Sequence, residues 1–341
     1  MKPIDLRSDT VTQPSKAMRE AIFNAEVGDD VFSEDPTVIK LQRKCAELSG
    51  KQSSLFVTTG CLGNQLAIKG HTVQGDEVIC ESEAHIFHYE TSAPSIISNV
   101  QLHTVPGTNG VMNVEDIKSA IRSDEYYFPK TKLICLENTH NRAGGTIQPI
   151  ENIKDIYSLA KQNNIKVHID GARIFNASAE TGITLKEYAQ YCDSISFCFS
   201  KGLGAPVGSI LCGDYELITL AHKWRKILGG GMRQSGILAA AALYALDNNV
   251  TRLKEDNNNA MYFAKEISAL EKVNINIDAV QTNIVVFEVK GIVKDEFLGH
   301  MKDKGVLMSS GSYSNIRAVF HLDVSREEVV KAVKLIKEYL T

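Results

Sequence analysis

The chain has 341 residues, of which 43% are hydrophobic and 23% charged, a composition typical of a globular protein. Because domains usually contain ~100–200 residues, this length predicts one large domain and a smaller one. A formal net charge of −4 argues against a nucleic-acid-binding protein, which usually carries a basic surface, although it allows a basic pocket for a small anion.

The seven cysteines form no CxxC pair. Most lie in apolar runs typical of buried strands, so we interpret them as reduced core residues, as expected in the cytoplasm. The opening residues, MKPIDLRSDT, lack the apolar segment of a signal peptide. No stretch approaches the ~20 apolar residues of a membrane span, so we expect no membrane partner.

Short apolar runs and helical apolar periods alternate along the first 248 residues. Strands are predicted at 53–59, 77–80, 101–105, 132–136, 166–169, 194–199 and 208–212. Helices are predicted at 60–70, 114–122, 150–163 and 232–246. This alternation is typical of βαβ units, which build a mostly parallel sheet covered by helices on both faces.

The pattern changes near Asn248. Helices are then expected at 251–270, 294–304 and 326–340, and strands at 284–289 and 316–320. We therefore predict a large α/β domain over residues 1–248 and a small α+β domain over residues 249–341. The N-terminal segment is a candidate for sharing between the two domains.

Polar residues and glycines follow the predicted strands at their carboxyl ends, where parallel α/β sheets bind ligands. They are Gly60, Cys61, His85, Asp170, Arg173, Ser200 and Lys201. Because these ends meet at one edge of a sheet, we expect the residues to form a single site.

The turn from Gly60 to Gly63 opens a predicted helix. Free N–H groups and the helix dipole suit a phosphate at such a place, and a plain tight turn is the alternative. Neither GxGxxG nor GxxxxGK[ST] occurs, so the fingerprints of dinucleotide and nucleoside triphosphate sites are absent.

Lys201 stands directly after an apolar strand and before a run rich in glycine. Burial disfavours the charged form of a lysine, and a neutral amine attacks a carbonyl to form a Schiff base. We interpret the neighbouring glycines as space for a flat cofactor to approach the backbone. An ordinary surface lysine is the alternative.

Asp170 ends a predicted buried strand, where a carboxylate either caps a turn or pairs with a cationic ring nitrogen. A metal is a third alternative, but HExxH and Cys/His clusters are absent, so we predict no metal site. A Schiff-base lysine, a carboxylate and a phosphate-binding turn are together what pyridoxal phosphate requires. His85 offers a ring that stacks on such a cofactor, with a hydrogen-bonded structural histidine as its alternative.

Several blocks of the sequence resemble those of the low-specificity L-threonine aldolases, in the β-eliminating lyase superfamily of fold type I pyridoxal phosphate enzymes. They are DLRSDTVTQP (5–14), VGDDVFSEDPTV (27–38), ESEAHIFHYE (81–90), LENTHNRAGG (136–145), HIDGARIFNA (168–177), SKGLGAPVGS (200–209), GGGMRQSGILAAA (229–241) and HLDVSRE (321–327). The blocks occur in the same order and span nearly the whole chain. The resemblance implies a large domain with a mostly parallel sheet and a smaller α+β domain.

The resemblance also implies how the cofactor is held. Lys201 would form the Schiff base, Asp170 would pair with the pyridine nitrogen, and His85 would stack on the ring. Gly60 and Cys61 would donate backbone N–H groups to the phosphate. Further residues implied at the cofactor are Arg173, Ser200 and Arg233.

For the substrate, the resemblance implies that Ser8 and Arg317 hold the carboxylate and that Arg173 lies nearby. Lys226 is implied to reach the site, and both it and Arg233 are candidates to come from a neighbouring subunit. A homo-oligomer, a dimer or a tetramer, with sites near the subunit interface is therefore expected.

The chain departs from the family pattern at two of these positions. Tyr127 stands where bacterial members usually have a histidine that contacts the β-hydroxyl, so Tyr127 is a candidate substrate residue and His85 the better base. Cys61 stands where threonine or serine is common, so one hydroxyl contact with the phosphate would be missing.

The implied reaction is retro-aldol cleavage of L-threonine or L-allo-threonine to glycine and acetaldehyde, catalysed by Lys201, His85 and Asp170. One alternative is other pyridoxal phosphate chemistry on a small amino acid, namely β-elimination or racemisation. A second alternative is a non-enzymatic binding protein that retains the fold.

Overall fold

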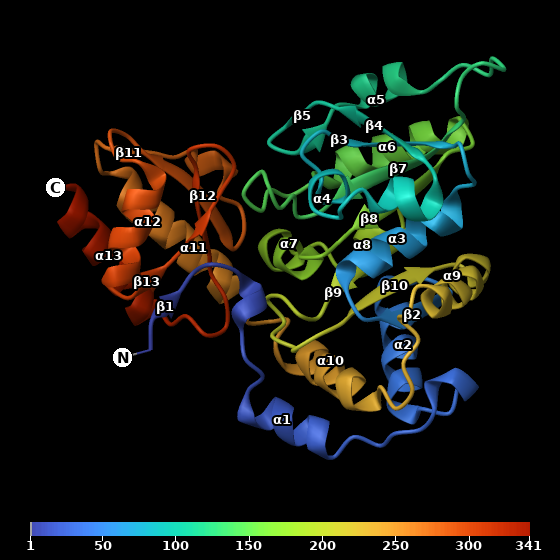
Figure 1. The fold of residues 1–341 in the computed structure, drawn as a ribbon, viewed down its shortest axis with the longest axis horizontal. Coiled ribbons are helices and arrows are strands. Elements are labelled where there is room, and N and C mark those ends of the chain that lie inside the picture. The colour runs from blue at the N-terminus through green and yellow to red at the C-terminus, as the bar shows by residue number, and fades with distance from the viewer. Residues whose placement is uncertain (1) are drawn as a thin grey trace.

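We analysed a computed structural model of the chain, which describes residues 2–341. Its centre is a seven-stranded sheet in the order β2-β10-β9-β8-β7-β3-β4 (Figure 1). The strands are β2 (Ser53–Val57), β3 (Glu77–Glu81), β4 (Gln101–Val105), β7 (Thr131–Glu137), β8 (Lys166–Asp170), β9 (Ser194–Cys198) and β10 (Ser209–Gly213). Only β10 runs antiparallel to its neighbours, β2 and β9. The prediction of a mostly parallel sheet is confirmed.

Helices cover both faces of this sheet, as the buried residues of β2 show. Phe56 belongs to a large apolar core that includes residues of α2, α6, α7 and α10, whereas Leu55 and Val57 pack into a second cluster with α3 and α9. The helices of this domain are α1 (Lys16–Phe23), α2 (Pro36–Ser49), α3 (Gly60–His71), α4 (His85–His88), α5 (Val114–Ala120), α6 (Ile150–Gln162), α7 (Ile174–Thr181), α8 (Leu185–Ala189), α9 (Tyr215–Ile227) and α10 (Gly236–Asn248). Side chains alternate across a strand, so one apolar run serves both faces.

The C-terminal part forms a separate layer, drawn in orange and red in Figure 1. Its four-stranded antiparallel sheet has the order β11-β12-β15-β14. The strands are β11 (Val273–Asn274), β12 (Ile284–Val289), β14 (Ser309–Ser310) and β15 (Ile316–Val319), and the helices are α11 (Leu253–Ser268), α12 (Lys294–Asp303) and α13 (Arg326–Leu340). These elements share their own apolar core.

The first strand of the chain pairs with this C-terminal part rather than with the large sheet. Strand β1 (Ile4–Asp5) pairs in parallel with β13 (Val306–Leu307), and Leu6 lies in the same apolar core. The domain division at residue 248, where α10 ends, stays a prediction. Within residues 2–341, no helix has both the length and the apolar surface required to cross a lipid bilayer.

The helix predicted from residue 232 begins instead at Gly236. The N–H group of Gly236 donates to Asp35 Oδ2 at 2.8 Å, so the carboxylate that caps α2 also holds the first residue of α10. Asp35 lies 201 residues from Gly236 in sequence, which explains why local periodicity placed the start of α10 too early.

Candidate active site

A cavity of about 280 Å³ lies at the carboxyl ends of β2, β8 and β9. It brings together most of the residues predicted at the strand ends. Its lining includes Gly60, Cys61, His85, Asp170, Ser200 and Lys201. The structure therefore brings six of the seven predicted residues to one cavity, all but Arg173, whereas the role of each remains a prediction.

The first turn of α3 forms one wall of the cavity. Thr59 caps this helix, because its Oγ1 accepts the N–H of Leu62 at 3.1 Å. The N–H groups of Gly60 and Cys61, as the first two of the helix, have no partner within it. They face a cavity beside the positive end of the helix dipole, which suits an anionic group.

Asp170 is buried at the end of β8, and hydrogen bonds fix both of its oxygens. Oδ1 accepts the N–H of Ala172 at 3.0 Å, and Oδ2 accepts Nδ2 of Asn64 at 2.7 Å. Burial raises the pKa of Asp170, but the charges of His85 and Lys201 and the Asn64 hydrogen bond outweigh it and lower the pKa. Asp170 is therefore an anion held in place, and it caps the turn, while its pairing with a cationic ring nitrogen stays a prediction.

Glu90, which the sequence did not indicate, organises the same region. Its buried carboxylate accepts hydrogen bonds from Asn64 Nδ2 at 2.8 Å and Gln65 Nε2 at 2.6 Å, and it lies 2.9 Å from His85 Nδ1. Asn64 therefore links the two carboxylates of Glu90 and Asp170. The contact of Glu90 with Nδ1 orients His85, and the His85 ring lines the cavity.

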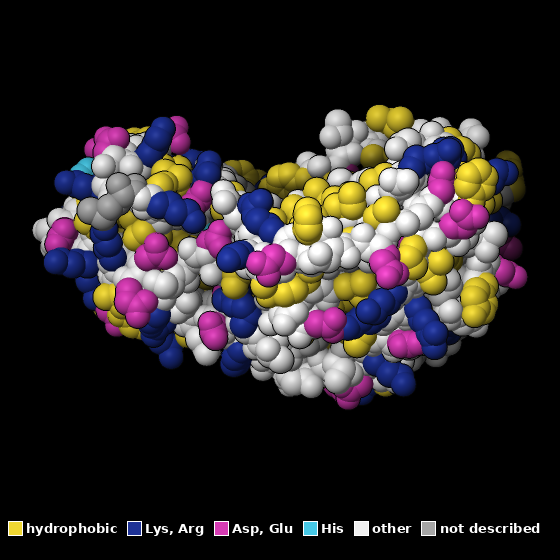
Figure 2. All heavy atoms as spheres, turned by 90° about the horizontal axis from the view of Figure 1, so that it is seen from below, with side chains coloured by type: hydrophobic (Ala, Val, Ile, Leu, Met, Phe, Trp, Pro, Cys, Tyr) yellow, Lys and Arg dark blue, Asp and Glu magenta, His cyan; other side chains and the backbone are white. Residues whose placement is uncertain are grey.

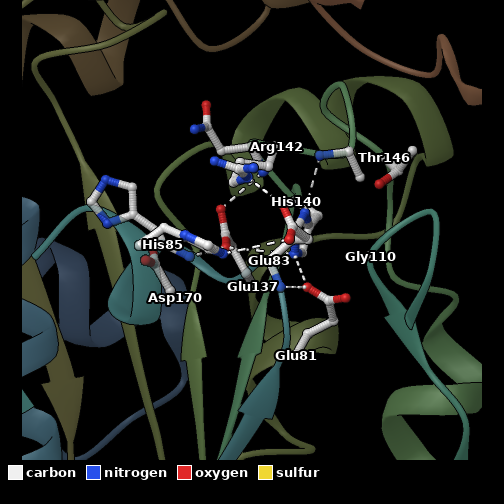
Figure 3. Close-up of polar contacts among 12 residues, drawn as sticks. Glu81, Glu83, His85, Gly110, Glu137, His140, Arg142, Thr146 and Asp170 are labelled. Atoms are coloured by element: carbon white, nitrogen blue, oxygen red, sulfur yellow. Dashed lines mark hydrogen bonds and ion pairs between the residues drawn. The ribbon is translucent and has the colours of Figure 1, made fainter. Parts of the chain in front are cut away.

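Glu137 joins the His85 segment to the segment that follows β7 (Figure 3). Its two oxygens accept the backbone N–H groups of His85, at 2.8 Å, and Asn141, at 2.9 Å. His140 lies behind it and contacts Glu81 at 2.9 Å. This buried polar cluster fixes the backbone on which two site residues stand.

His168, on the same strand as Asp170, supports the site through Asn64. Its Nδ1 lies 2.9 Å from Ser194 Oγ and its Nε2 lies 3.3 Å from Asn64 Oδ1. Because Asn64 uses its NH₂ group on the carboxylates, its oxygen accepts from His168, which places the proton on Nε2. Burial lowers the pKa of His168 to about 3, so the ring is neutral near pH 7.

This histidine gives a pH dependence of stability. Its folded pKa lies below the unfolded value of about 6.5, so its contribution is complete above pH 6.5 and is lost as the pH falls towards 3. We expect His168→Gln to remove up to ~1.4 kcal/mol per pH unit from the slope of the unfolding free energy in this range. Urea titrations at several pH values measure the unfolding free energy and hence this slope. Equal slopes for the variant and the parent chain would contradict the assignment of a lowered pKa to His168.

Lys201 lies three residues beyond β9, half-buried at the cavity wall. Its positive charge acts on the carboxylates of both Asp9 and Asp170. The rigid end of β9 therefore presents an amine close to an anchored carboxylate and to the first turn of α3.

The interpretation of the glycines beside Lys201 was wrong. A Cβ on Gly202 would meet Leu253 Cδ2 of α11 at 2.9 Å, and one on Gly204, where φ is +76°, would meet Leu322 at 3.1 Å. These positions face the C-terminal part of the chain rather than the cavity. The glycines therefore allow the loop to turn and pack, and space for a flat cofactor comes from the cavity itself.

Arg173 does not line the cavity but forms a buried ion pair with Asp9. Its Nε and Nη2 lie 2.6 and 2.7 Å from the two oxygens of Asp9, with side chains only 4% and 0% exposed. Although burial acts in the opposite direction, the Arg173 guanidinium and its hydrogen bonds hold the pKa of Asp9 well below its usual range. The N-terminal segment is thus tied to the end of β8 by a bidentate pair.

Removing one partner of this pair should be costly. We expect Asp9→Ala to lower the free energy of unfolding by about 3–5 kcal/mol, because Arg173 would remain buried without a counter-charge. The matched control is Glu47→Ala, which breaks the exposed Arg43–Glu47 pair and should cost less than about 1 kcal/mol. Similar losses in the two variants, measured by urea unfolding, would show that the buried pair adds nothing.

Arg317 stands beside this pair with spare donor capacity. Its Nη2 donates to Asn141 Oδ1 at 2.9 Å, the same oxygen that accepts Arg173 Nη1 at 3.1 Å. Arg317 Nε is buried and has no hydrogen-bond partner among residues 2–341. Burial, together with the charge of Arg173, lowers the pKa of Arg317 to about 10. Two guanidiniums near one carboxylate leave an excess positive charge that suits an anion.

Ser8 lies next to this arginine, since Arg317 Nη1 donates to the carbonyl of Arg7 at 3.3 Å. The Ser8 hydroxyl accepts the N–H of Thr10 at 3.2 Å and caps a short turn. The structure therefore places Arg317 against the residue that precedes Ser8, and a joint role of Ser8 and Arg317 in binding a carboxylate stays a prediction.

None of the predicted substrate residues lines the cavity, and neither does Arg233, which was predicted at the cofactor. Tyr127 is 63% exposed in the loop between α5 and β7. Lys226 is exposed near the end of α9, and Arg233, with its side chain 60% exposed, pairs with Asp29 at 3.2 Å. Any contact of these residues with a site requires movement or a second subunit.

Comparison with known proteins decides the family. The family described as beta-eliminating lyase matches residues 5–290. The chain belongs to the beta-eliminating lyase family. It is 44% identical to a low-specificity L-threonine aldolase of Escherichia coli K12 over 330 residues, which cover 96% of each chain. A probable low-specificity L-threonine aldolase 2 of Arabidopsis thaliana is 43% identical over 336 residues, or 96% of this chain and 95% of that one.

Solved structures confirm the fold of this lyase as fold type I. A threonine aldolase from Leishmania major superposes with a TM-score of 0.85 at 19% identity, covering 99% of this chain and all (100%) of that one. A putative L-allo-threonine aldolase from Listeria monocytogenes superposes with a TM-score of 0.83 at 18% identity, covering 99% of this chain and 97% of that one.

Sequence reasoning missed five polar residues that organise the site of this lyase, namely Asp9, Asn64, Glu90, Glu137 and Asn141. All of them except Asn64 lie within the blocks that carry the family resemblance. A usable signal was a charged or amide side chain beside a predicted strand end, as for Glu137 directly after the apolar run of β7.

Proposed function

We propose that the cavity binds pyridoxal phosphate, with Lys201 as the residue that holds it covalently. The observation that carries this proposal is the convergence of Lys201, anionic Asp170 and the first turn of α3 on one cavity. Gly60 and Cys61 would donate N–H groups to the phosphate, and His85 would lie against the ring. The residues present therefore fit the cofactor in charge and in chemistry.

When bound, this cofactor supplies an electron sink for the electron pair left at Cα when a bond there breaks. Asp170 supports that role, because a buried carboxylate with a lowered pKa favours a protonated, cationic ring nitrogen. Asn64 keeps the carboxylate oriented through its 2.7 Å hydrogen bond.

The substrate carboxylate would bind at Arg317. Its unpartnered Nε and the excess positive charge shared with Arg173 favour a bidentate carboxylate. Ser8 stands beside it as a further donor. Holding the carboxylate would fix the orientation of Cα in the site, and thereby which of its bonds can break.

His85 is the candidate base for the proton of the β-hydroxyl. Burial lowers its pKa, but the hydrogen bond to Glu90 and the charges of Asp170 and Glu137 outweigh burial and raise the pKa above 6.5. A base must be neutral, so we expect kcat/KM to rise with pH through a pKa above 6.5. Glu90→Gln should move this rise of kcat/KM to lower pH. If the rise of kcat/KM with pH persists in His85→Asn, His85 is not the base.

The reaction we propose is cleavage of L-threonine and L-allo-threonine to glycine and acetaldehyde. The enzyme would then be an aldehyde-lyase that acts in threonine breakdown and glycine formation. The identity to low-specificity L-threonine aldolases supports this choice. The test is product analysis with both substrates and added cofactor. Pyruvate with ammonia would indicate β-elimination instead, and the D-enantiomer would indicate racemisation.

We also propose that the enzyme is a homo-oligomer, a dimer or a homotetramer. Seen from below, the molecule shows apolar side chains gathered on its surface (Figure 2), and α1 and α10 on this side expose Phe23 and Ile237. Lys226, Arg233 and Tyr127 would then reach a neighbouring site. Light scattering after gel filtration tests this, and a monomer would contradict it.

Localisation in the cytoplasm remains part of the same proposal. All seven cysteines are free, six of them buried, which suits a reducing compartment. Fractionation of cells that express the native chain tests the assignment.

A further inference from the structure

Cys61 lies in a group of three potential metal ligands that the proposed reaction does not use together. Single ligand atoms of Cys61, His85 and Glu90 all lie within 4.8 Å of one another. Tetrahedral zinc with sulfur and nitrogen ligands holds its donor atoms about 3.3–3.7 Å apart, so displacements near ~1 Å would complete the geometry. A thiol, an imidazole and a carboxylate form a donor set that suits zinc.

The surroundings of these three residues hold them ready. Asn64 and Gln65 fix the Glu90 carboxylate, and Glu90 fixes the His85 ring at 2.9 Å. Cys61 is exposed on the first turn of α3, so its side chain can adjust to the other two. The cavity beside them leaves space for water at a fourth position.

Charge in the cavity favours a cation when no cofactor is present. The carboxylates of Asp170 and Glu137 line the cavity and the buried carboxylate of Glu90 lies next to His85, against the single ammonium of Lys201. A bound cation would offset these negative charges and displace the thiol proton.

We propose that, in the cofactor-free enzyme, Cys61, His85 and Glu90 bind a thiophilic divalent cation of the zinc class. The same His85 ring and the same first turn of α3 are those that we assign to pyridoxal phosphate. Cation and cofactor therefore exclude each other, and this exclusion rests on the proposed function. Cation binding delays formation of the holoenzyme and is reversed by the cofactor.

Cofactor-free enzyme titrated with Co²⁺ tests the site itself, because a thiolate ligand gives Co²⁺ a charge-transfer absorption. We expect this band in the parent chain, at one equivalent per chain. The test variant is Cys61→Ser, which should lose the band. The matched control is Cys198→Ser, which removes another cysteine of the cavity and should keep the band. No band in the parent, or a band that persists in Cys61→Ser, would overturn the proposal.

Zn²⁺ then tests the exclusion. With Zn²⁺ at ten times its dissociation constant, the concentration of pyridoxal phosphate needed for half-saturation should rise about elevenfold in the parent chain. The rise should be less than about twofold in Cys61→Ser, and a chromophoric chelator should report release of Zn²⁺ when the cofactor is added. An equal rise in both proteins would contradict the site. Turnover of threonine by metal-free holoenzyme is measured separately, so failure here leaves the proposed function standing.

Discussion

Replacing Lys201 with alanine should lower kcat for threonine cleavage by at least ~10³-fold. The proposed chemistry requires covalent attachment at this amine, and groups that act as a covalent unit show losses of this size or larger when removed. Folding should be little affected, because Lys201 is only half-buried and lines an open cavity. Steady-state assays for acetaldehyde measure the loss, and thermal unfolding checks that the variant is folded.

The matched control is Lys331→Ala on α13, an exposed lysine outside the cavity. It should retain the parental kcat. The cofactor absorbance should also disappear in Lys201→Ala and persist in the control. A folded Lys201→Ala variant with parental turnover would refute the assigned mechanism.

Arg317→Ala should raise KM for threonine, and the dissociation constant for glycine, by about 10–150-fold. This range corresponds to losing a charge-assisted hydrogen-bonded contact of ~1.5–3 kcal/mol. The effect should fall mainly on binding, because Arg317 lies beside Asn141 and Arg173 rather than at Lys201. Isothermal titration with glycine measures the affinity directly.

Arg317→Lys separates charge from geometry. Lysine retains the positive charge but lacks the planar fork, so glycine affinity should fall between those of the parent and Arg317→Ala. An unchanged glycine affinity in Arg317→Ala would show that the carboxylate binds elsewhere.

The strands of the large sheet were predictable because each is a short run with a clear boundary, whereas two-residue strands such as β1 and β13 were not predicted. β4, for example, was predicted with the bounds it has, and β8 differs from its prediction only by the addition of Asp170. The antiparallel direction of β10 was not predictable, since a strand buried on both faces has the same apolar pattern in either direction.

Two long helices were overlooked although their start signals are in the sequence. Asp35 followed by Pro36 begins α2, where Asp35 accepts the N–H groups of Thr37 and Val38. Asp214 caps α9 in the same way. Attention to caps as well as to apolar periods would have found both helices.

The site was predictable only in its residues at strand ends. Lys201, Asp170 and His85 follow three strands whose order in the sheet brings them to one edge. The contacts that support these residues were not predictable, because Asn64 is separated in sequence by 26 residues from Glu90 and by 106 residues from Asp170. Similarly, Gly202 was misjudged because its close neighbour Leu253 belongs to a distant helix.

The most direct test of the central claim is the position of the cofactor on the chain. Borohydride reduction of the holoenzyme fixes pyridoxal phosphate to the amine that holds it, and proteolysis with mass spectrometry then locates the label. We predict a single labelled residue, Lys201, at one label per chain. A label at any other lysine, or no label in an enzyme that still releases acetaldehyde from threonine, would contradict the account.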